Sequence, residues 1–357
     1  MSALTMPARP DSAGDAGPRP IPWRRMAGVT WRQHRYALAG VVVLLGALAV
    51  WVWTAGSSLH NAYAAAIACH PVNSAACVNL VVSFNESATN KFMGSKGAGG
   101  VLLQVMPALI GAFVGAPVLA RELETGTFRF AWTQGFGRWR WALAKLALLG
   151  VVLAAATAAF GVLVSWYFQP ESGAGNQIPG LYEASQFPNL FSLREVTFPA
   201  WTLAAFTIAA VVGMLIRRVV PAIVATLAVY AGLAFAAAGL LREHYLTPLV
   251  TSSLNVSLPG AGTAWTISQW STKDGRFAFA GNPPDSLVNQ FCSTVPPDKI
   301  GPLGFAPCLA QHGYTQWTSY QPASRFWPFQ WIEGGWLLVL SALLIAAAIW
   351  LVQRRAA

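Results

Sequence analysis

The chain has 357 residues, of which 55% are hydrophobic and only 10% are charged. Soluble domains carry about 25% charged residues, and here the charge is absent from long apolar blocks, which excludes an ordinary soluble protein. The formal net charge of +10 does not indicate a nucleic-acid partner, because the basic residues lie beside apolar segments, where anionic lipid headgroups explain them.

The N-terminal region divides into two predicted parts. Residues 1–20 are rich in Pro, Ala and Gly, and we expect them to form a disordered cytoplasmic tail. Residues 23–35 mix Trp, Met and Val with Arg, which is typical of a helix lying in the inner membrane interface. A secretory signal peptide is not expected, because the charged region is too long and the apolar block after it is a full span. Residues 21–357 are predicted to form a single transmembrane domain.

Six apolar segments are long enough to cross a bilayer. A spanning helix needs roughly 20 mostly apolar residues, because its backbone must satisfy its own hydrogen bonds in lipid. The predicted spans are residues 36–55, 101–120, 141–168, 198–216, 219–241 and 336–352. The predicted fold is therefore an all-α integral membrane protein with six transmembrane helices.

The boundary between the fourth and fifth spans depends on one dipeptide, Arg217-Arg218. Without a break there, the two segments would form one apolar helix too long for a bilayer, with two arginines at its middle, where charge is very costly. Pro221 suits the first turn of a new helix. We therefore predict a tight hairpin between these two spans.

The distribution of charge predicts which side of the membrane each loop faces. Six spans place both termini on one side, and that side carries 15 basic and four acidic residues, against 8 basic and 9 acidic residues in the longer loops opposite. Basic residues are enriched in cytoplasmic loops. We therefore expect both termini to be cytoplasmic in a bacterial plasma membrane, and residues 242–335 to form a large extracellular loop.

Four cysteines, all on the predicted extracellular side, provide a separate check on this topology. Disulfides persist in that compartment. We predict the pairs Cys69–Cys77 and Cys292–Cys308, because each closes a short local loop, with cross-pairing between the loops and free thiols as the alternatives. If the fourth and fifth spans were one helix, the two pairs would face opposite compartments. A zinc site is not expected, since CxxC spacing is absent.

Motifs for catalysis or ion coupling do not occur in the sequence. It has no G-x-x-x-x-G-K-[ST] phosphate loop, no HExxH and no GxSxG. The predicted spans hold no Asp, Glu or His, which counts against a proton-driven carrier and against a membrane enzyme with a buried acid or base. We expect no enzyme activity, no cofactor and no metal on this chain.

The most informative stretch is residues 115–145, the predicted cytoplasmic loop after the second span with its flanks. The second span should continue through Arg121, Glu122 and Glu124. Gly126 can then take the left-handed conformation that ends a helix. The sequence thus predicts where this helix stops.

A short amphipathic helix is predicted next, over residues 128–134. Thr127 can cap it, and Phe128 and Trp132 lie on one face at i and i+4. From these residues alone, the helix either couples the membrane spans to a partner or simply connects two spans at the interface.

The same stretch resembles the signature of type-2 ABC transporter permeases, particularly the six-span permeases of actinobacteria. The matching residues are Ala120-Arg121-Glu122-Leu123-Glu124-Thr125-Gly126-Thr127, Trp132-Thr133-Gln134, Arg138, Arg140-Trp141 and Lys145. Residues 31–35 before the first span, and residues 320–322, 325–327 and 330–333 before the sixth, resemble the same group. The likeness therefore touches both ends and the centre of the chain.

In that family the helix between the second and third spans is a coupling helix against a separate ATP-binding subunit. The resemblance implies that such a contact here would involve Arg121, Glu122, Glu124, Thr125, Gly126, Thr127, Phe128 and Trp132. It also implies two permease subunits, with a homodimer favoured, and ATP and Mg²⁺ bound by the partner ATPases. The loop 242–335 is similar in position to the outer cap of G-type ABC exporters.

We therefore expect the permease subunit of an ATP-driven exporter, in contact with membrane lipid and without nucleic acid. Two other classes stay open. One is a membrane-anchored sensor or scaffold that binds a ligand through its outer loops, which contain Trp265, Trp270, Trp317 and Trp327. The other is a membrane enzyme using the outer loop, although that loop lacks a paired acid and base.

Overall fold

The structure is a computed structural model, and it describes residues 22–71, 74–89, 98–126, 138–170, 191–252, 264–293 and 305–355. Within these residues, six helices are long and apolar enough to cross a membrane, as predicted. The predicted spans fall one on each of α1 (Trp23–Ala68), α3 (Ala98–Thr125), α5 (Arg138–Tyr167), α7 (Thr197–Ile216), α8 (Val219–Ala236) and α11 (Phe326–Arg355). The predicted disordered tail, residues 1–20, lies outside the described residues.

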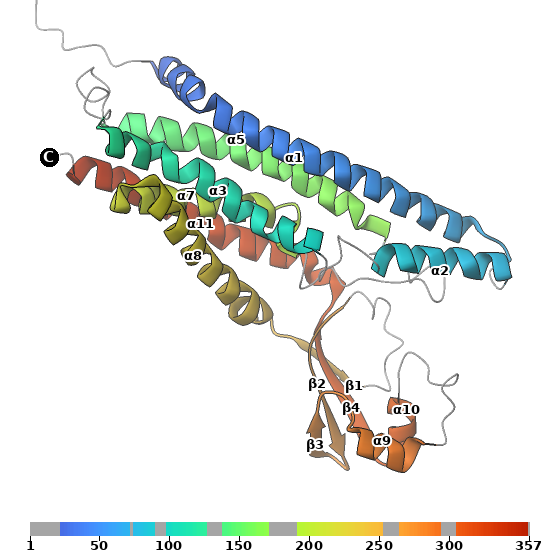
Figure 1. The fold of residues 1–357 in the computed structure, drawn as a ribbon. Helices are drawn as coiled ribbons and strands as arrows, with labels where there is room; N and C mark the ends of the chain where they lie inside the picture. Colours follow the sequence, from blue (N-terminus) through green and yellow to red (C-terminus); the bar gives the residue numbers. More distant parts are fainter. Residues whose placement is uncertain are drawn as a thin grey trace, which may run out of the picture.

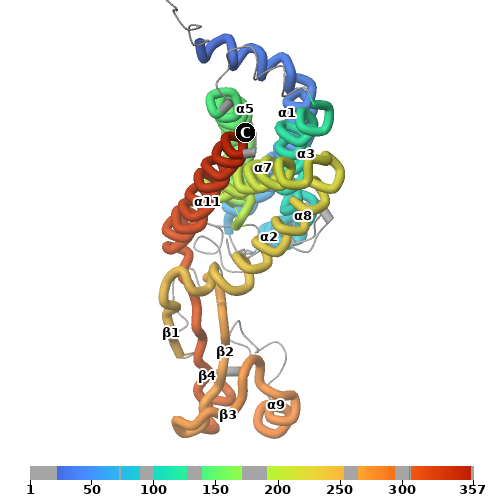
Figure 2. The backbone as a smooth tube through the Cα atoms, turned by 90° about the vertical axis from the view of Figure 1, so that its left-hand side faces the viewer, coloured from blue at the N-terminus to red at the C-terminus, as the bar shows by residue number. Residues whose placement is uncertain are grey.

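The six helices form one bundle in which α1 begins and α11 ends at the same end, called here the terminal end (Figure 1). The opposite end is called the far end. Most of α7 is buried, and Figure 2 shows it in the middle of the bundle, with α3 and α8 on one side and α5 and α11 on the other. The core of the membrane region is therefore built around α7.

Helices α3 and α7 approach each other unusually closely. A Cβ atom added to Gly111 would lie 2.3 Å from the Cβ of Ala205, and one added to Gly115 would lie 2.5 Å from the carbonyl oxygen of Phe206. Glycines four residues apart leave a flat helix face, and in membranes such faces let two backbones pack by van der Waals contact. The sequence Gly111-x-x-x-Gly115 thus positions α7 against α3.

The hairpin between α7 and α8 is confirmed. Arg217 has φ of 59°, and its N–H donates a 2.9 Å hydrogen bond to the carbonyl oxygen of Gly213, which closes the end of α7. The next helix starts at Val219, with Pro221 in its first turn, where a missing N–H costs nothing. Two separate spans result.

Helix α1 is longer than predicted. It runs without interruption over 46 residues, roughly 70 Å at 1.5 Å per residue, whereas the hydrocarbon core is about 30 Å thick. A separate interfacial helix over residues 23–35 is not observed, because no proline interrupts the chain there and the helix continues into the span. Figure 2 shows that its N-terminal part nevertheless turns across the terminal end of the bundle.

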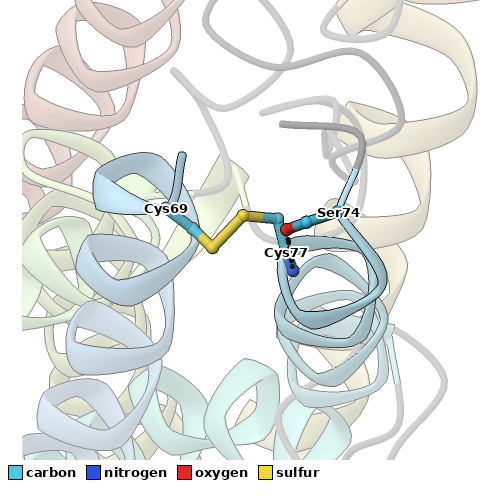
Figure 3. Close-up of a disulfide and its surroundings, with 3 residues drawn as sticks. All are labelled: Cys69, Ser74 and Cys77. Carbon is cyan, nitrogen blue, oxygen red and sulfur yellow. Dashed lines mark hydrogen bonds between the residues drawn. A yellow bond between two sulfur atoms is a disulfide. The ribbon is translucent and has the colours of Figure 1, made fainter. Parts of the chain in front are cut away.

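Beyond the bundle, α1 is followed by α2 (Ala75–Thr89), a helix that was not predicted. The Cys69–Cys77 disulfide joins the end of α1 to the start of α2, with Cα atoms 5.5 Å apart (Figure 3). The N–H of Cys77 donates to Ser74 Oγ at 3.3 Å. The predicted local pairing is confirmed, and it fixes the turn between the two helices.

The prediction of an all-α chain is wrong for residues 242–335. Helix α8 continues through η2 (Ala237–Leu241) and η3 (Arg242–His244), and the chain then forms an antiparallel four-stranded sheet of order β1-β4-β2-β3. The elements that follow are β1 (Leu249–Ser252), β2 (Trp265–Lys273), β3 (Arg276–Ala280), α9 (Asp285–Cys292), α10 (Ala306–Ala310), β4 (Tyr314–Gln321) and η6 (Ala323–Arg325).

Local sequence explains these strands. Strand β2 is rich in Thr and Trp, and β4 is rich in Thr, Trp and Tyr, residues that pack well on a pleated surface. The two strands pair antiparallel, with Trp270 opposite Trp317. Asp274 and Gly275 both have positive φ between β2 and β3, which is the backbone of a tight hairpin turn. The Asp274-Gly275 dipeptide is therefore a local sequence signal for the hairpin of β2 and β3.

The sheet and its two short helices form one unit, called here the β domain (residues 249–321), which stands beyond the far end of the bundle (Figure 1). The second predicted disulfide, Cys292–Cys308, is also confirmed, and it ties α9 to α10 with Cα atoms 6.0 Å apart. Cys292, Leu309 and Tyr314 form a small buried cluster beneath it. The disulfide supplements a core too small to hold these helices alone.

Candidate functional site

The C-terminal end of α3 lies at the terminal end of the bundle, as the sequence predicts. The helix stops at Thr125, and Gly126 follows with φ of 71°, a left-handed conformation that glycine adopts without strain. Thr125 Oγ1 donates to the carbonyl oxygen of Arg121 at 2.8 Å. The side chains of Arg121, Glu124 and Thr125 are exposed. This helix end therefore exposes one positively charged, one negatively charged and one hydroxyl-bearing side chain.

One acidic residue of this helix end points inward. Lys145 Nζ of α5 donates to Glu122 Oε1, and Lys145 is almost completely buried, with its ammonium 4.5 Å from the centre of the Trp141 ring. A buried ammonium without a partner is very costly, so the carboxylate of Glu122 is needed where it is. Glu122 therefore links α3 to α5 and does not form part of the exposed surface.

The second acidic residue links α3 to the hairpin between α7 and α8. Glu124 Oε2 accepts a 3.4 Å hydrogen bond from the N–H of Val219, the first residue of α8. The first N–H groups of a helix have no partner within it, and a carboxylate there is favoured by the helix dipole. Together, Glu122 and Glu124 connect the end of α3 to α5 and α8.

The start of α1 reaches the same end of the bundle. Trp23 lies edge-on to Trp139 with ring centres 6.3 Å apart, and the guanidinium of Arg140 lies 4.9 Å from the Trp23 ring centre. Four further arginines of this part of α1 are exposed: Arg24, Arg25, Arg32 and Arg35. A basic, tryptophan-containing part of α1 thus lies beside the start of α5.

Three of the predicted contact residues, Thr127, Phe128 and Trp132, lie outside the described residues, as does the predicted helix 128–134. The structure therefore describes the two ends of this loop, Gly126 and Arg138, and the helices to which they belong. No group of three or more His, Cys, Asp or Glu side chains in the described ranges is arranged to hold a metal ion.

A buried charge at the far end was not predicted. The sixth span was predicted at residues 336–352, but α11 begins at Phe326, so Glu333 lies inside the helix with no exposed surface. Its carboxylate pairs with the buried guanidinium of Arg242, at 2.8 Å from Oε1 to Nη2. The predicted span 336–352 holds no acidic residue, but the observed helix α11 also includes Glu333. The mostly apolar residues 326–332, which precede Glu333, were a local sign that the helix starts earlier.

Comparison with protein families finds one match, to the family described as ABC-2 membrane transporter related, over residues 41–242. The matched region runs from α1 to the end of α8 and covers more than half of the chain, including the loop between α3 and α5. No curated protein and no solved structure matches the chain. Because this match covers more than half of the chain, the chain belongs to the ABC-2 membrane transporter related family.

Proposed function

We propose that this chain is the transmembrane permease subunit of an ATP-driven ABC exporter, and that a separate ATP-binding subunit drives it through the loop between α3 and α5. Family membership and six apolar helices support a transporter membrane subunit. In the proposed orientation, the terminal end faces the cytoplasm, where an ATPase could reach this loop. ATP and Mg²⁺ would bind to the partner, since this sequence has no phosphate loop.

The observation that carries the proposal is the bonding at the base of the loop. Glu122 is tied to Lys145 of α5, and Glu124 is tied to Val219 of α8. A push on the loop would therefore displace the ends of three helices together rather than bend a free segment. A partner can only shift a conformational equilibrium if its contacts differ between the two states, and this linkage gives a route by which loop contacts could do so.

The exposed residues of the helix end are suited to the partner contact. Arg121, Glu124 and Thr125 are exposed beside the loop, whereas Glu122 is not. We propose that Arg121 and Thr125, with the loop residues Thr127, Phe128 and Trp132, face the ATP-binding subunit. Glu122 would then act from behind this surface by holding α3 against α5.

The same proposal includes a second permease subunit, most simply a copy of this chain, and the lipid around it. Exposed apolar side chains cover the outer faces of several spans, for example Val43 of α1, Phe235 of α8 and Leu343 of α11. Such faces are covered in a membrane by lipid or by another span. The arginines of α1 at the terminal end would contact anionic headgroups of the inner leaflet.

The β domain favours a second candidate, a membrane-anchored sensor or scaffold that binds a ligand outside the cell. This domain is a folded unit with its own disulfide, and it lies beyond the far end of the bundle. A sensor or scaffold would work without an ATP-binding subunit, so the two candidates differ in whether such a subunit copurifies.

The test is copurification with the ATP-binding subunits of the same genome, followed by reconstitution in liposomes. We expect one of these subunits to copurify, and its ATP hydrolysis to respond to the permease. Glu122→Gln combined with Glu124→Gln should reduce that response more than tenfold while the complex still assembles. The matched control is Glu243→Gln, which alters a partly exposed carboxylate at the far end, 3.8 Å from His244, and should leave the response unchanged.

Two results would contradict the proposal. One is a wild-type chain that purifies without any ATP-binding subunit, which would favour the sensor or scaffold. The other is a double variant whose coupling equals that of the wild type. The orientation is tested separately by fusing a fluorescent protein that matures only in the cytoplasm to the C-terminus, where fluorescence is expected.

A further inference from the structure

The β domain is connected to the bundle by two chain segments, called here the neck: residues 242–248, which leave α8, and residues 321–326, which enter α11. Domains joined by short segments usually move relative to each other unless the contact between them is extensive and apolar. The neck therefore decides whether the β domain is a loose appendage or a rigid extension of the bundle.

A single buried carboxylate accepts hydrogen bonds from α7 and from the first segment of the neck. Glu333 of α11 accepts from Trp201 Nε1 of α7 at 2.8 Å, from Arg242 Nε at 2.9 Å and Nη2 at 2.8 Å, and from the Tyr245 hydroxyl at 3.2 Å. Burial and the nearby Glu333 carboxylate raise the pKa of Tyr245 above its ordinary value, so the hydroxyl remains a donor. One side chain thus holds α7, α11 and the first segment of the neck.

A second layer of bonds reinforces this cluster one helical turn away. Gln330 Oε1 accepts from the N–H and the hydroxyl of Thr197 at 3.1 and 3.0 Å, and Gln330 Nε2 donates to the carbonyl oxygen of Phe191 at 2.9 Å. Arg242 Nη2 also donates to Ser192 Oγ at 2.9 Å. The segment before α7 is therefore held by the same two helices.

The two segments of the neck are bonded to each other as well. Gln321 Nε2 donates to the carbonyl oxygen of Leu246 at 2.7 Å, and Gln321 is fully buried. Arg325 Nη1 donates to the carbonyl oxygen of Thr247 at 2.6 Å and to Gln321 Oε1 at 2.7 Å. Both segments therefore have specific partners and cannot move independently without breaking these bonds.

Aromatic packing brings the sheet itself into this contact. The buried rings of Phe191, Phe326 and Phe329 form a cluster to which Tyr245 and Trp265 add their rings. Trp265, the first residue of β2, lies edge-on to Phe329 of α11 with ring centres 6.4 Å apart. The apolar contact excludes water from the hydrogen-bonded cluster beside it, which strengthens those bonds.

We propose that Glu333 fixes the β domain to the far ends of α7, α8 and α11. The β domain and these helix ends would then move as one rigid body. Removing one partner of a buried ion pair leaves an uncompensated charge, which opposes any motion that separates α11 from Arg242. When these helix ends move, the β domain then moves with them, because the neck does not act as a hinge. This inference does not depend on the proposed exporter function, because it concerns only contacts within this chain.

The experiment is hydrogen–deuterium exchange on the full-length chain in lipid nanodiscs, followed in peptides that cover residues 242–249 and 321–330. In the wild type, these peptides should be as protected as peptides from α7. Glu333→Gln keeps the size of the side chain but places an amide donor against the Arg242 donors. It should speed exchange in both neck peptides at least tenfold while peptides from β2 and β4 keep their protection.

The matched control is Glu243→Gln, next to Arg242 in sequence but partly exposed, which should leave exchange in the neck unchanged. Arg242→Lys, which can keep the ion pair but cannot also reach Ser192, should give a smaller increase than Glu333→Gln. The proposal is overturned if the wild-type neck exchanges as fast as an unstructured peptide, a result that needs no variant to fold. It is equally overturned if Glu333→Gln and Glu243→Gln give the same neck exchange.

Discussion

Replacing Gly111 by alanine should weaken the bundle at its centre, although alanine is the better helix former. The new methyl carbon would lie 2.3 Å from the Cβ of Ala205 and 2.6 Å from the backbone nitrogen of Phe206. Carbon atoms pack at about 3.5–4.0 Å, so α3 and α7 would have to separate by at least about 1 Å. Neither neighbour is the end of a flexible side chain that could turn away. Overpacking of this kind costs about 1–3 kcal/mol.

The same substitution at Gly46 provides the comparison. Gly46 lies on an exposed face of α1, and nothing lies within 4 Å of an added Cβ. Gly46→Ala should therefore be neutral or stabilising by roughly 0.5–1 kcal/mol, because alanine loses less backbone entropy in a helix. The chemical change is identical, so the expected difference of roughly 1–4 kcal/mol between the two variants reports the packing of α3 on α7.

Thermal unfolding in detergent micelles measures this difference. The 16 tryptophans supply the intrinsic fluorescence signal. We expect the midpoint of Gly111→Ala to lie several degrees below that of Gly46→Ala, on the basis of about 2–4 °C per kcal/mol for a chain region of this size. A midpoint for Gly111→Ala equal to or above that of Gly46→Ala would refute the close approach of the two helices.

Two further predictions concern the far end. Replacing Cys292 and Cys308 together by serine opens a closed loop of about 15 residues, which is worth on the order of 3 kcal/mol in the chain-entropy model. Helices α9 and α10 should then become sensitive to protease while the spans stay folded. Unchanged protease resistance of these two helices would contradict this prediction. Trp201→Phe removes the Nε1 donor to the buried carboxylate of Glu333 and should cost about 1–3 kcal/mol. Trp331→Phe alters an exposed ring on the same helix as Glu333 and should cost almost nothing, so equal melting shifts for the two variants would show that the hydrogen bond contributes nothing.

The number of spans, the hairpin after Ile216 and the end of α3 at Gly126 could be predicted from the sequence. Each depends on residues that are neighbours along the chain: a run of apolar side chains of sufficient length, two arginines that interrupt such a run, or a glycine that adopts positive φ. Both disulfides belong to the same class, because cysteines separated by only 8 and 16 positions are close along the chain. Membership of the family likewise follows from local motifs in one matched region.

The outer loop could have been predicted in part. The Asp274-Gly275 turn and the threonine-rich and aromatic strands beside it are local signals for a hairpin, but they were outweighed by the apolar spans. The pairing of β4 with both β1 and β2 is different in kind. It joins Tyr320 to Leu249 and to Thr266, residues more than 50 positions apart, and no local pattern specifies which strands become neighbours.

The partners of the buried charges were decided by the tertiary structure alone. By sequence, Glu122 is an exposed acid at a helix end, and only the packing of α5 on α3 brings the Lys145 ammonium to it. Glu333 and Arg242 are separated by 91 positions and meet because η3, which continues α8, lies at the neck where α11 begins. A charged side chain can be buried only where the folded chain places a partner beside it. The sequence therefore determined which segments are apolar enough to span the membrane, and only the packed bundle determined which charged residues could be buried among them.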